Sequence, residues 1–283
     1  TALLKPKSFL LTNGPSPIYR VIVYLFALPS VAGIPIGVPG GVVEIRLPLS
    51  TTNVFFNEVQ QLQLDNRAIV ALPLTSKVGH HTIIVQSSKS RTELPFKVIA
   101  KTYREQHLTI ENQRLVEPLP SDLERIEAES ALMQNVYSQF SPMPKRLRPI
   151  TLPVQGVVTS EFGFRRFFNG QPRNPHSGVD IAAEHGTPVK SPAPGVIRVV
   201  GNFFFNGNTV LVDHGGGFIS MLCHLSKVNV HQQQLVEQDS IIGTVGATGR
   251  ATGPHLHWSV SLQGTRVDPL VFVTVINASA NGE

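Results

Sequence analysis

The stretch Thr252-Gly-Pro-His-Leu-His-Trp258 decides how the rest of this chain is interpreted. Its two histidines, His255 and His257, are two residues apart, and alternate side chains of an extended strand point to the same face. The glycine and proline before them interrupt regular structure, and residues 258–262 have the composition of a strand. Two imidazoles that project into one site favour metal ligation or acid–base chemistry, although an H-x-H pair alone is a weak indication.

Two upstream segments carry candidate partners for these histidines. In Pro175-His-Ser-Gly-Val-Asp180, His176 precedes Asp180 by four residues, in a turn that leads into a strand. Taken alone, this spacing is explained as well by an ordinary His–Asp hydrogen bond. His224 ends the strand-like run of residues 217–222, and taken alone it is better interpreted as a buried histidine of the core.

Together these residues form a set with a recognisable chemistry. His176, Asp180 and His257 supply two imidazoles and a carboxylate, and zinc in hydrolases typically has three protein ligands and a fourth position for water. His224 and His255 then remain as unligated imidazoles that can move a proton or stabilise an oxyanion. The chain has no H-E-x-x-H sequence, which excludes a helix-borne zinc site of that type.

The composition indicates a mainly β protein with many turns. Hydrophobic residues make up 41% of the 283 residues and charged residues 15%, and the chain has 23 glycines and 22 prolines. The net charge of +5 is mild and spread along the sequence, so nucleic acid is not expected as a partner, whereas an anionic cell wall is compatible. A single cysteine excludes an internal disulfide and a Cys₄ or Cys₂His₂ zinc site.

The N-terminal residues 1–32 have the features of a leader with a signal peptide. Arg20 precedes the apolar run 21–28, and Ser30 and Ala32 occupy the small-residue positions of a cleavage site after Ala32. A buried strand is the alternative interpretation of this run. The run is too short for a spanning helix, and no other stretch is long and apolar enough, so we expect no membrane span after cleavage.

The remainder divides by its pattern into four parts. Short alternating runs separated by turn residues predict a small antiparallel β accessory domain over residues 33–103. Residues 104–150 are expected to be a linker, with a helix at about 121–139 that Ser121 and Glu124 would cap. Glycine-rich, strand-rich residues 151–273 hold every candidate for chemistry, and residues 274–283 are expected to be a C-terminal tail.

The motifs of residues 151–273 resemble the lysostaphin/LytM-type zinc metallopeptidases of family M23. The resemblance covers roughly residues 152–272 and rests on an H-x(3)-D motif, a middle His-Leu pair and a closing H-x-H, in the family's order. It implies a β-sheet peptidase domain with one Zn²⁺ per chain at the floor of a groove. The zinc ligands would be His176, Asp180 and His257, and the catalytic residues His224 and His255.

The resemblance also implies a substrate and a location. Family members hydrolyse peptide cross-links of peptidoglycan, and the accessory region is similar to that of Gram-negative secreted members, which cut the D-alanyl–diaminopimelate bond. We therefore expect an exported DD-endopeptidase in the periplasm or cell envelope, or secreted, whose N-terminal domain could inhibit it intramolecularly. The alternative is a non-catalytic LytM-like module that activates a cell-wall amidase. Leu222 stands where relatives commonly have a tyrosine, which leaves the metal set intact but could alter rate or specificity.

Overall fold

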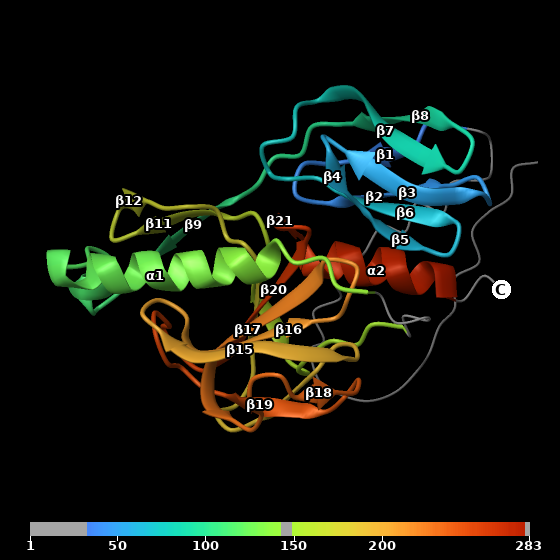
Figure 1. Cartoon of the computed structure of the whole chain (residues 1–283). Coiled ribbons are helices and arrows are strands. Elements are labelled where there is room, and N and C mark those ends of the chain that lie inside the picture. The colour runs from blue at the N-terminus through green and yellow to red at the C-terminus, as the bar shows by residue number, and fades with distance from the viewer. Residues whose placement is uncertain (1–32, 143–148, 281–283) are drawn as a thin grey trace, which may run out of the picture. The chain divides into compact units, whose positions relative to one another are not determined.

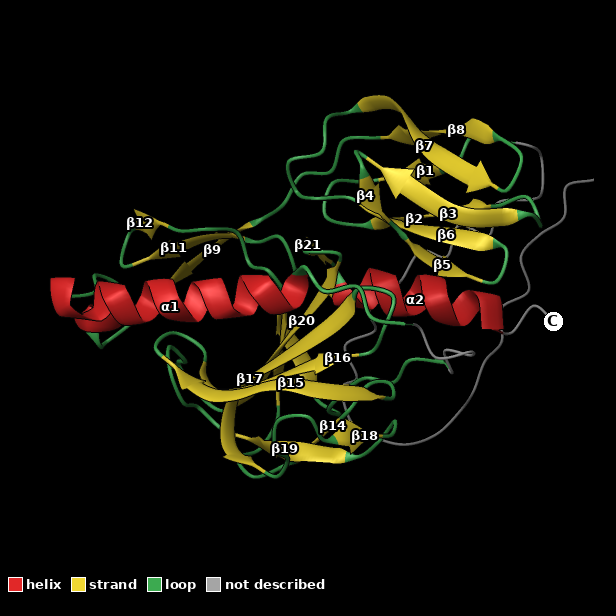
Figure 2. Ribbon diagram, in the orientation of Figure 1, coloured by secondary structure: helices red, strands yellow, loops and turns green. Residues whose placement is uncertain are grey.

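The computed structural model describes residues 33–142 and 149–280 of the chain; the predicted signal peptide lies outside them. The fold of the described residues is mainly β, with two α-helices among many strands (Figure 2). Contacts group residues 34–283 into one compact unit. The prediction of a mainly β fold is confirmed.

The N-terminal strands form a five-stranded and a three-stranded sheet. The first has the order β1-β8-β7-β3-β4 and the second the order β2-β6-β5. All neighbours in them are antiparallel except β1 and β8. The strands are β1 (Ile36–Gly37), β2 (Val42–Arg46), β3 (Thr51–Phe56), β4 (Val59–Gln60), β5 (Leu62–Leu64), β6 (Arg67–Ala71), β7 (Gly79–Ser87) and β8 (Arg91–Val98).

The three-stranded sheet carries apolar side chains into two cores because successive side chains of a strand face opposite ways. Val43 and Ile45 of β2 pack with Phe96 of the five-stranded sheet. Val42 and Ile69 instead belong to a core cluster formed mainly by residues of the C-terminal half. The sequence predicts a half-buried strand here but does not reveal this second layer of packing.

The connecting segment contributes structure to the C-terminal half. Strand β9 (Glu105–Leu108) pairs in parallel with β11 (Arg165–Phe168), and β12 (Gln171–Pro172) completes this small sheet. A 3₁₀ helix, η1 (Gln113–Leu115), follows, and then helix α1 (Pro120–Tyr137). Helix α1 lies where the sequence predicts it, but the Asp122 carboxylate, rather than the Ser121/Glu124 pair, accepts from the Leu119 N–H at 3.0 Å.

The C-terminal half is built on one large sheet. Its main path has the order β10-β13-β20-β17-β16-β15-β18, and β14, β19 and β21 pair at its margins. The long central strands run side by side (Figure 1). Their bounds are β10 (Val157–Ser160), β13 (Val179–Ala182), β14 (Pro188–Lys190), β15 (Gly195–Phe203), β16 (Gly207–Asp213), β17 (Phe218–Val228), β18 (Leu235–Val236), β19 (Ile241–Val245), β20 (His255–Leu262) and β21 (Thr265–Val267).

The end of the chain corrects one expectation. Residues 274–280, expected to be part of a tail, belong to helix α2 (Pro269–Ala280). The Asp268 carboxylate accepts from the Leu270 N–H at 3.0 Å at the start of this helix, and Phe272 and Ile276, one turn apart, are buried in the large core. Neither helix in the described ranges has the length and apolarity that crossing a membrane requires.

Candidate metal centre and active site

The pairing of three strands places the candidate residues together. In the ladder between β13 and β20, Asp180 lies directly opposite His257. On its other side β20 pairs with β17, where Cys223 lies opposite His257, so His224 follows immediately. His176 comes from the turn before β13, which passes so close to β20 that a Cβ at Gly178 would lie 2.4 Å from the Trp258 carbonyl oxygen. This close approach explains the glycine between His176 and Asp180.

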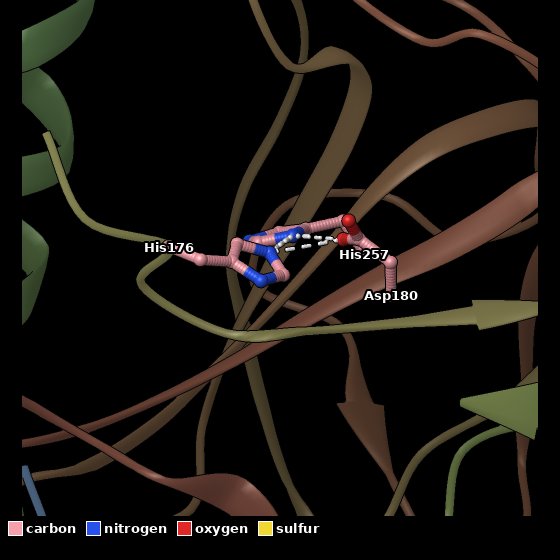
Figure 3. A group of neighbouring side chains, drawn as sticks. All are labelled: His176, Asp180 and His257. Atoms are coloured by element: carbon pink, nitrogen blue, oxygen red, sulfur yellow. Dashed lines mark hydrogen bonds and ion pairs between the residues drawn. The ribbon is translucent and has the colours of Figure 1, made fainter. Parts of the chain in front are cut away.

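Three of the predicted residues converge on one point, as Figure 3 shows. The Asp180 Oδ1 atom is 2.7 Å from His257 Nδ1 and 3.0 Å from His176 Nε2, and these two nitrogens are 3.0 Å apart. Ligand atoms about 2.0–2.1 Å from a tetrahedral zinc ion are roughly 3.3 Å from one another. The donor set therefore fits a single metal ion after outward movements of a few tenths of an ångström.

The protonation states of this cluster also suit a metal ion. Burial lowers the pKa of His257 to about 4 and lowers the pKa of His176, in spite of their hydrogen bonds to Asp180. Burial alone would raise the pKa of Asp180, but its interactions with His176 and His257 lower it well below its usual value. At neutral pH the cluster consists of two neutral imidazoles and a carboxylate, which are the forms that bind metal ions.

His224 and His255 lie beside the cluster without joining it. Their ring centroids are 4.8 Å apart, and His255 Nε2 is 3.9 Å from Asp180 Oδ1. Each donates its Nδ1–H to a backbone carbonyl at 2.8 Å, His224 to Thr248 and His255 to Gly253. A carbonyl oxygen can only accept, so each imidazole keeps its Nε2 lone pair for other groups when it is neutral.

The backbone of His224 has a rare conformation, and hydrogen bonds hold the residue in it. Its φ of 61° is in the left-handed region, which residues other than glycine seldom adopt. The His224 N–H donates to the Asn206 carbonyl at 2.9 Å, and this bond and the Thr248 bond hold the residue in place. Burial, together with the nearby His255 and His257, lowers the pKa of His224 to about 3, so its ring is neutral at ordinary pH.

Asp180 has a further hydrogen-bond partner, Arg166, that no sequence motif indicated. Arg166 of β11 donates from Nη2 to Asp180 Oδ2 at 2.5 Å and to Ser160 Oγ at 3.1 Å. Its Nε donates to Gln106 Oε1 at 3.1 Å. The Ser160 hydroxyl is in turn 2.9 Å from Gln106 Oε1 and 3.1 Å from His176 Nδ1, whose principal acceptor is the Glu161 carbonyl at 2.8 Å.

No pattern in the sequence indicated this hydrogen-bond network. Arg166 follows another arginine and lies at no motif spacing from Asp180, and Gln106 belongs to a segment expected to be a linker. Gln106 reaches the network because β9 pairs with β11, which places Gln106 directly beside Arg166.

The cluster forms part of the wall of a cavity of about 360 Å³. Strands of the large sheet and the loop before β20 form one side of it. Its wall also includes Leu108, Ile110 and Val116 from the end of β9 and the residues that follow it, hereafter the 108–117 segment. Their apolar side chains pack with Phe168 in a small separate core.

The comparisons with known proteins agree with this geometry. The family model described as "Peptidase family M23" matches residues 174–269. A crystal structure of a protein assigned to M23 from Pseudomonas aeruginosa is 40% identical, with 83% of this chain and 94% of that chain covered and a TM-score of 0.68. The chain belongs to peptidase family M23.

Curated relatives match less than half of the M23 chain. The DD-carboxypeptidase/endopeptidase Mpg of Neisseria meningitidis serogroup B is 39% identical over 113 residues, which are 40% of this chain and 26% of Mpg. The peptidoglycan DD-endopeptidase ShyA of Vibrio cholerae is 35% identical over 135 residues, which are 48% of this chain and 26% of ShyA. The chain thus spans about a quarter of the length of these relatives.

We predict that Arg166→Ala weakens the binding of a divalent metal ion. Without the guanidinium, Asp180 loses the donor that fixes its orientation, and loss of such an outer hydrogen bond typically lowers metal affinity 10- to 100-fold. Competition with a chromogenic chelator measures the affinity directly. Arg165→Ala is the matched control, because Arg165 is the neighbouring, largely exposed arginine that pairs with Glu105. Equal affinities in the two variants, or a higher affinity in Arg166→Ala, would contradict this role.

Proposed function

We propose that this M23 chain is an exported zinc metalloendopeptidase that hydrolyses the peptide cross-links of peptidoglycan. The observation that carries the proposal is the convergence of His176, Asp180 and His257, with two further imidazoles beside them whose Nε2 atoms are free to accept a proton. Two relatives are named as endopeptidases with DD specificity, which supports the D-alanyl–diaminopimelate bond as the one cut and the cell envelope as the location.

Three residues of the site would bind the metal ion and two would transfer protons. His176 Nε2, Asp180 Oδ1 and His257 Nδ1 would hold the ion, and bound zinc supplies the Lewis acidity that lowers the pKa of water and polarises a carbonyl. One of the two imidazoles, His224 or His255, accepts the proton of the attacking water at Nε2. The proton taken from the water is then delivered to the leaving amine as the C–N bond breaks, and an imidazole that is protonated at Nε2 can hydrogen-bond the developing oxyanion.

The non-catalytic alternative, a module that activates an amidase, needs none of this apparatus. A binding module has no use for two imidazoles, one buried and one half-buried, that direct Nε2 away from their backbone hydrogen bonds beside a metal-ligand cluster. The presence of all five residues in one site therefore favours the enzyme.

We expect different losses from the two groups of residues. Asp180→Ala and His257→Ala should lose bound zinc and activity together, because each removes a ligand. His224→Ala and His255→Ala should keep most of the zinc and lose turnover by roughly 10²- to 10⁴-fold, the usual contribution of a general acid or base. Zinc content by mass spectrometry and turnover are measured on the same preparations. Loss of zinc from either member of the second pair would show that the roles are wrongly assigned.

Digestion of purified cross-linked peptidoglycan tests the activity itself. The zinc-loaded protein should convert cross-linked muropeptide dimers into monomers, and a chelator should abolish this conversion. The masses of the fragments identify the bond. Cleavage that persists in the chelator would exclude the proposed mechanism, and cleavage in the glycan strand would exclude an endopeptidase.

We also propose that the 108–117 segment restrains the enzyme. It forms one wall of the cavity, and Asn169 fastens it to the β11–β12 turn: the Asn169 side chain accepts from the Ile110 N–H at 2.8 Å and donates to the Ile110 carbonyl at 3.0 Å. A substrate strand would have to displace this segment to reach the metal cluster. The intramolecular inhibition that was expected of the N-terminal domain is therefore assigned to this one short segment.

Asn169→Gly should therefore increase the rate of cross-link cleavage. The change removes the three hydrogen bonds of the Asn169 side chain, the third of which goes to Gln113 Oε1 at 3.1 Å, and glycine suits the Asn169 φ of 50° without strain. Asn57→Gly is the matched control, because Asn57 has a φ of 49° in a turn of the N-terminal sheets. The ratio of kcat/KM between the two variants is the measurement, and a ratio at or below one would refute the restraint.

A further inference from the structure

The cavity wall contains a second feature that the proposed chemistry does not use. Arg250, in the loop before β20, lies between two aromatic rings, with its guanidinium carbon 4.6 Å from the centroid of Phe168 and 4.3 Å from that of Phe205. The Arg250 backbone N–H also donates to the Phe205 carbonyl at 2.8 Å. Contacts with two rings limit the freedom of the guanidinium, so it loses less freedom when it binds a ligand.

The charge of Arg250 is not balanced within the described part of the chain. No carboxylate there forms an ion pair with it, and its side-chain hydrogen bond goes from Nη1 to a neutral group, the Leu115 carbonyl, at 3.2 Å. Burial and the nearby charges of Arg166 and Arg173 lower the pKa of Arg250 to about 10. Because Asp180 is already bound by Arg166, it does not compensate Arg250. A half-buried cation in cationic surroundings is a site for an anion.

Arg173, whose charge lies near Arg250, also donates a hydrogen bond to a backbone carbonyl. Arg173 donates from Nη2 to the Val116 carbonyl at 3.0 Å, one residue beyond the carbonyl that Arg250 binds. Two consecutive carbonyl oxygens of the 108–117 segment are therefore held by two guanidinium groups within the cavity that contains the metal cluster. Carbonyl oxygens are weaker acceptors for arginine than carboxylate oxygens, which form charge-assisted and often bidentate hydrogen bonds.

We propose that Arg250, assisted by Arg173, binds a free carboxylate of the substrate peptide at or beside the scissile bond, and that the Leu115 and Val116 carbonyls occupy this subsite when the segment is in place. The proposal rests on the proposed function and specifies its substrate class. The preferred substrate is an anionic cross-linked stem peptide, and uncharged bridges, such as chains of glycine, would leave the Arg250 charge uncompensated. The same arginines would thus hold the restraining segment and select the substrate that replaces it.

The test measures binding rather than cleavage, so that it does not depend on turnover. Metal-free full-length protein is titrated by calorimetry with two forms of one cross-linked muropeptide dimer, with the diaminopimelate carboxylate free or amidated. The wild type should bind the free carboxylate tighter by roughly ten-fold or more, as for a hydrogen bond between charged groups. Arg250→Gln should bind both forms within about two-fold, and Arg250→Lys should keep part of the preference.

The ratio of the two affinities is taken within one protein, so any loosening of the 108–117 segment in a variant affects both ligands and cancels. Arg91→Gln, which removes an exposed arginine of β8, controls for the loss of net charge and should keep the wild-type ratio. A wild-type ratio near one, or a ratio unchanged in Arg250→Gln, would overturn the proposal. Failure of the zinc-loaded protein to cleave either dimer would count against the endopeptidase function and leave this ratio valid.

Discussion

The pairing register of three strands is the constraint on which the site depends. Asp180 and His257 face each other across the β13–β20 ladder, and β17 brings His224 to the same end of the sheet from the other side of β20. A slip of one residue in a β ladder sends every side chain to the opposite face. The core therefore protects the site: Val179, Trp258 and Leu222, at neighbouring positions in the same ladders, are fully buried and hold the register.

The second constraint is the burial of a negative charge. Asp180 is almost inaccessible to water, and removal of one partner from a buried ion pair typically costs about 3–5 kcal/mol. Arg166 compensates the charge of Asp180 from a hairpin outside the large sheet, and Gln106 supports Arg166 from the strand beside it. The segment upstream of the large sheet thus belongs to the site in two ways, through Gln106 and through the wall formed by residues 108–117. Both features lie upstream of residue 151, where the peptidase domain was expected to begin.

The sequence predicted those parts of the site that depend on local geometry. The two-residue spacing of His255 and His257 predicted a shared face, and the structure places both near Asp180. Contacts between distant segments left no local pattern, so the parallel pairing of β9 with β11 and the role of Arg166 were not foreseen. Helix α2 was missed because its Val-rich sequence favours strand by propensity; the burial of Phe272 and Ile276 in the core overrides that preference. The proposed roles of the five residues remain predictions.

We expect Asp180 and His257 of the large sheet and His176 of the turn before β13 to bind one metal ion. Anomalous diffraction at the zinc edge, from crystals of zinc-loaded protein, tests it most directly. We expect one strong peak per chain, within bonding distance of His176 Nε2, Asp180 Oδ1 and His257 Nδ1 and no closer than van der Waals contact to His224 and His255. A peak that has either of these two histidines as a ligand, or the absence of a peak between β13 and β20, would contradict it.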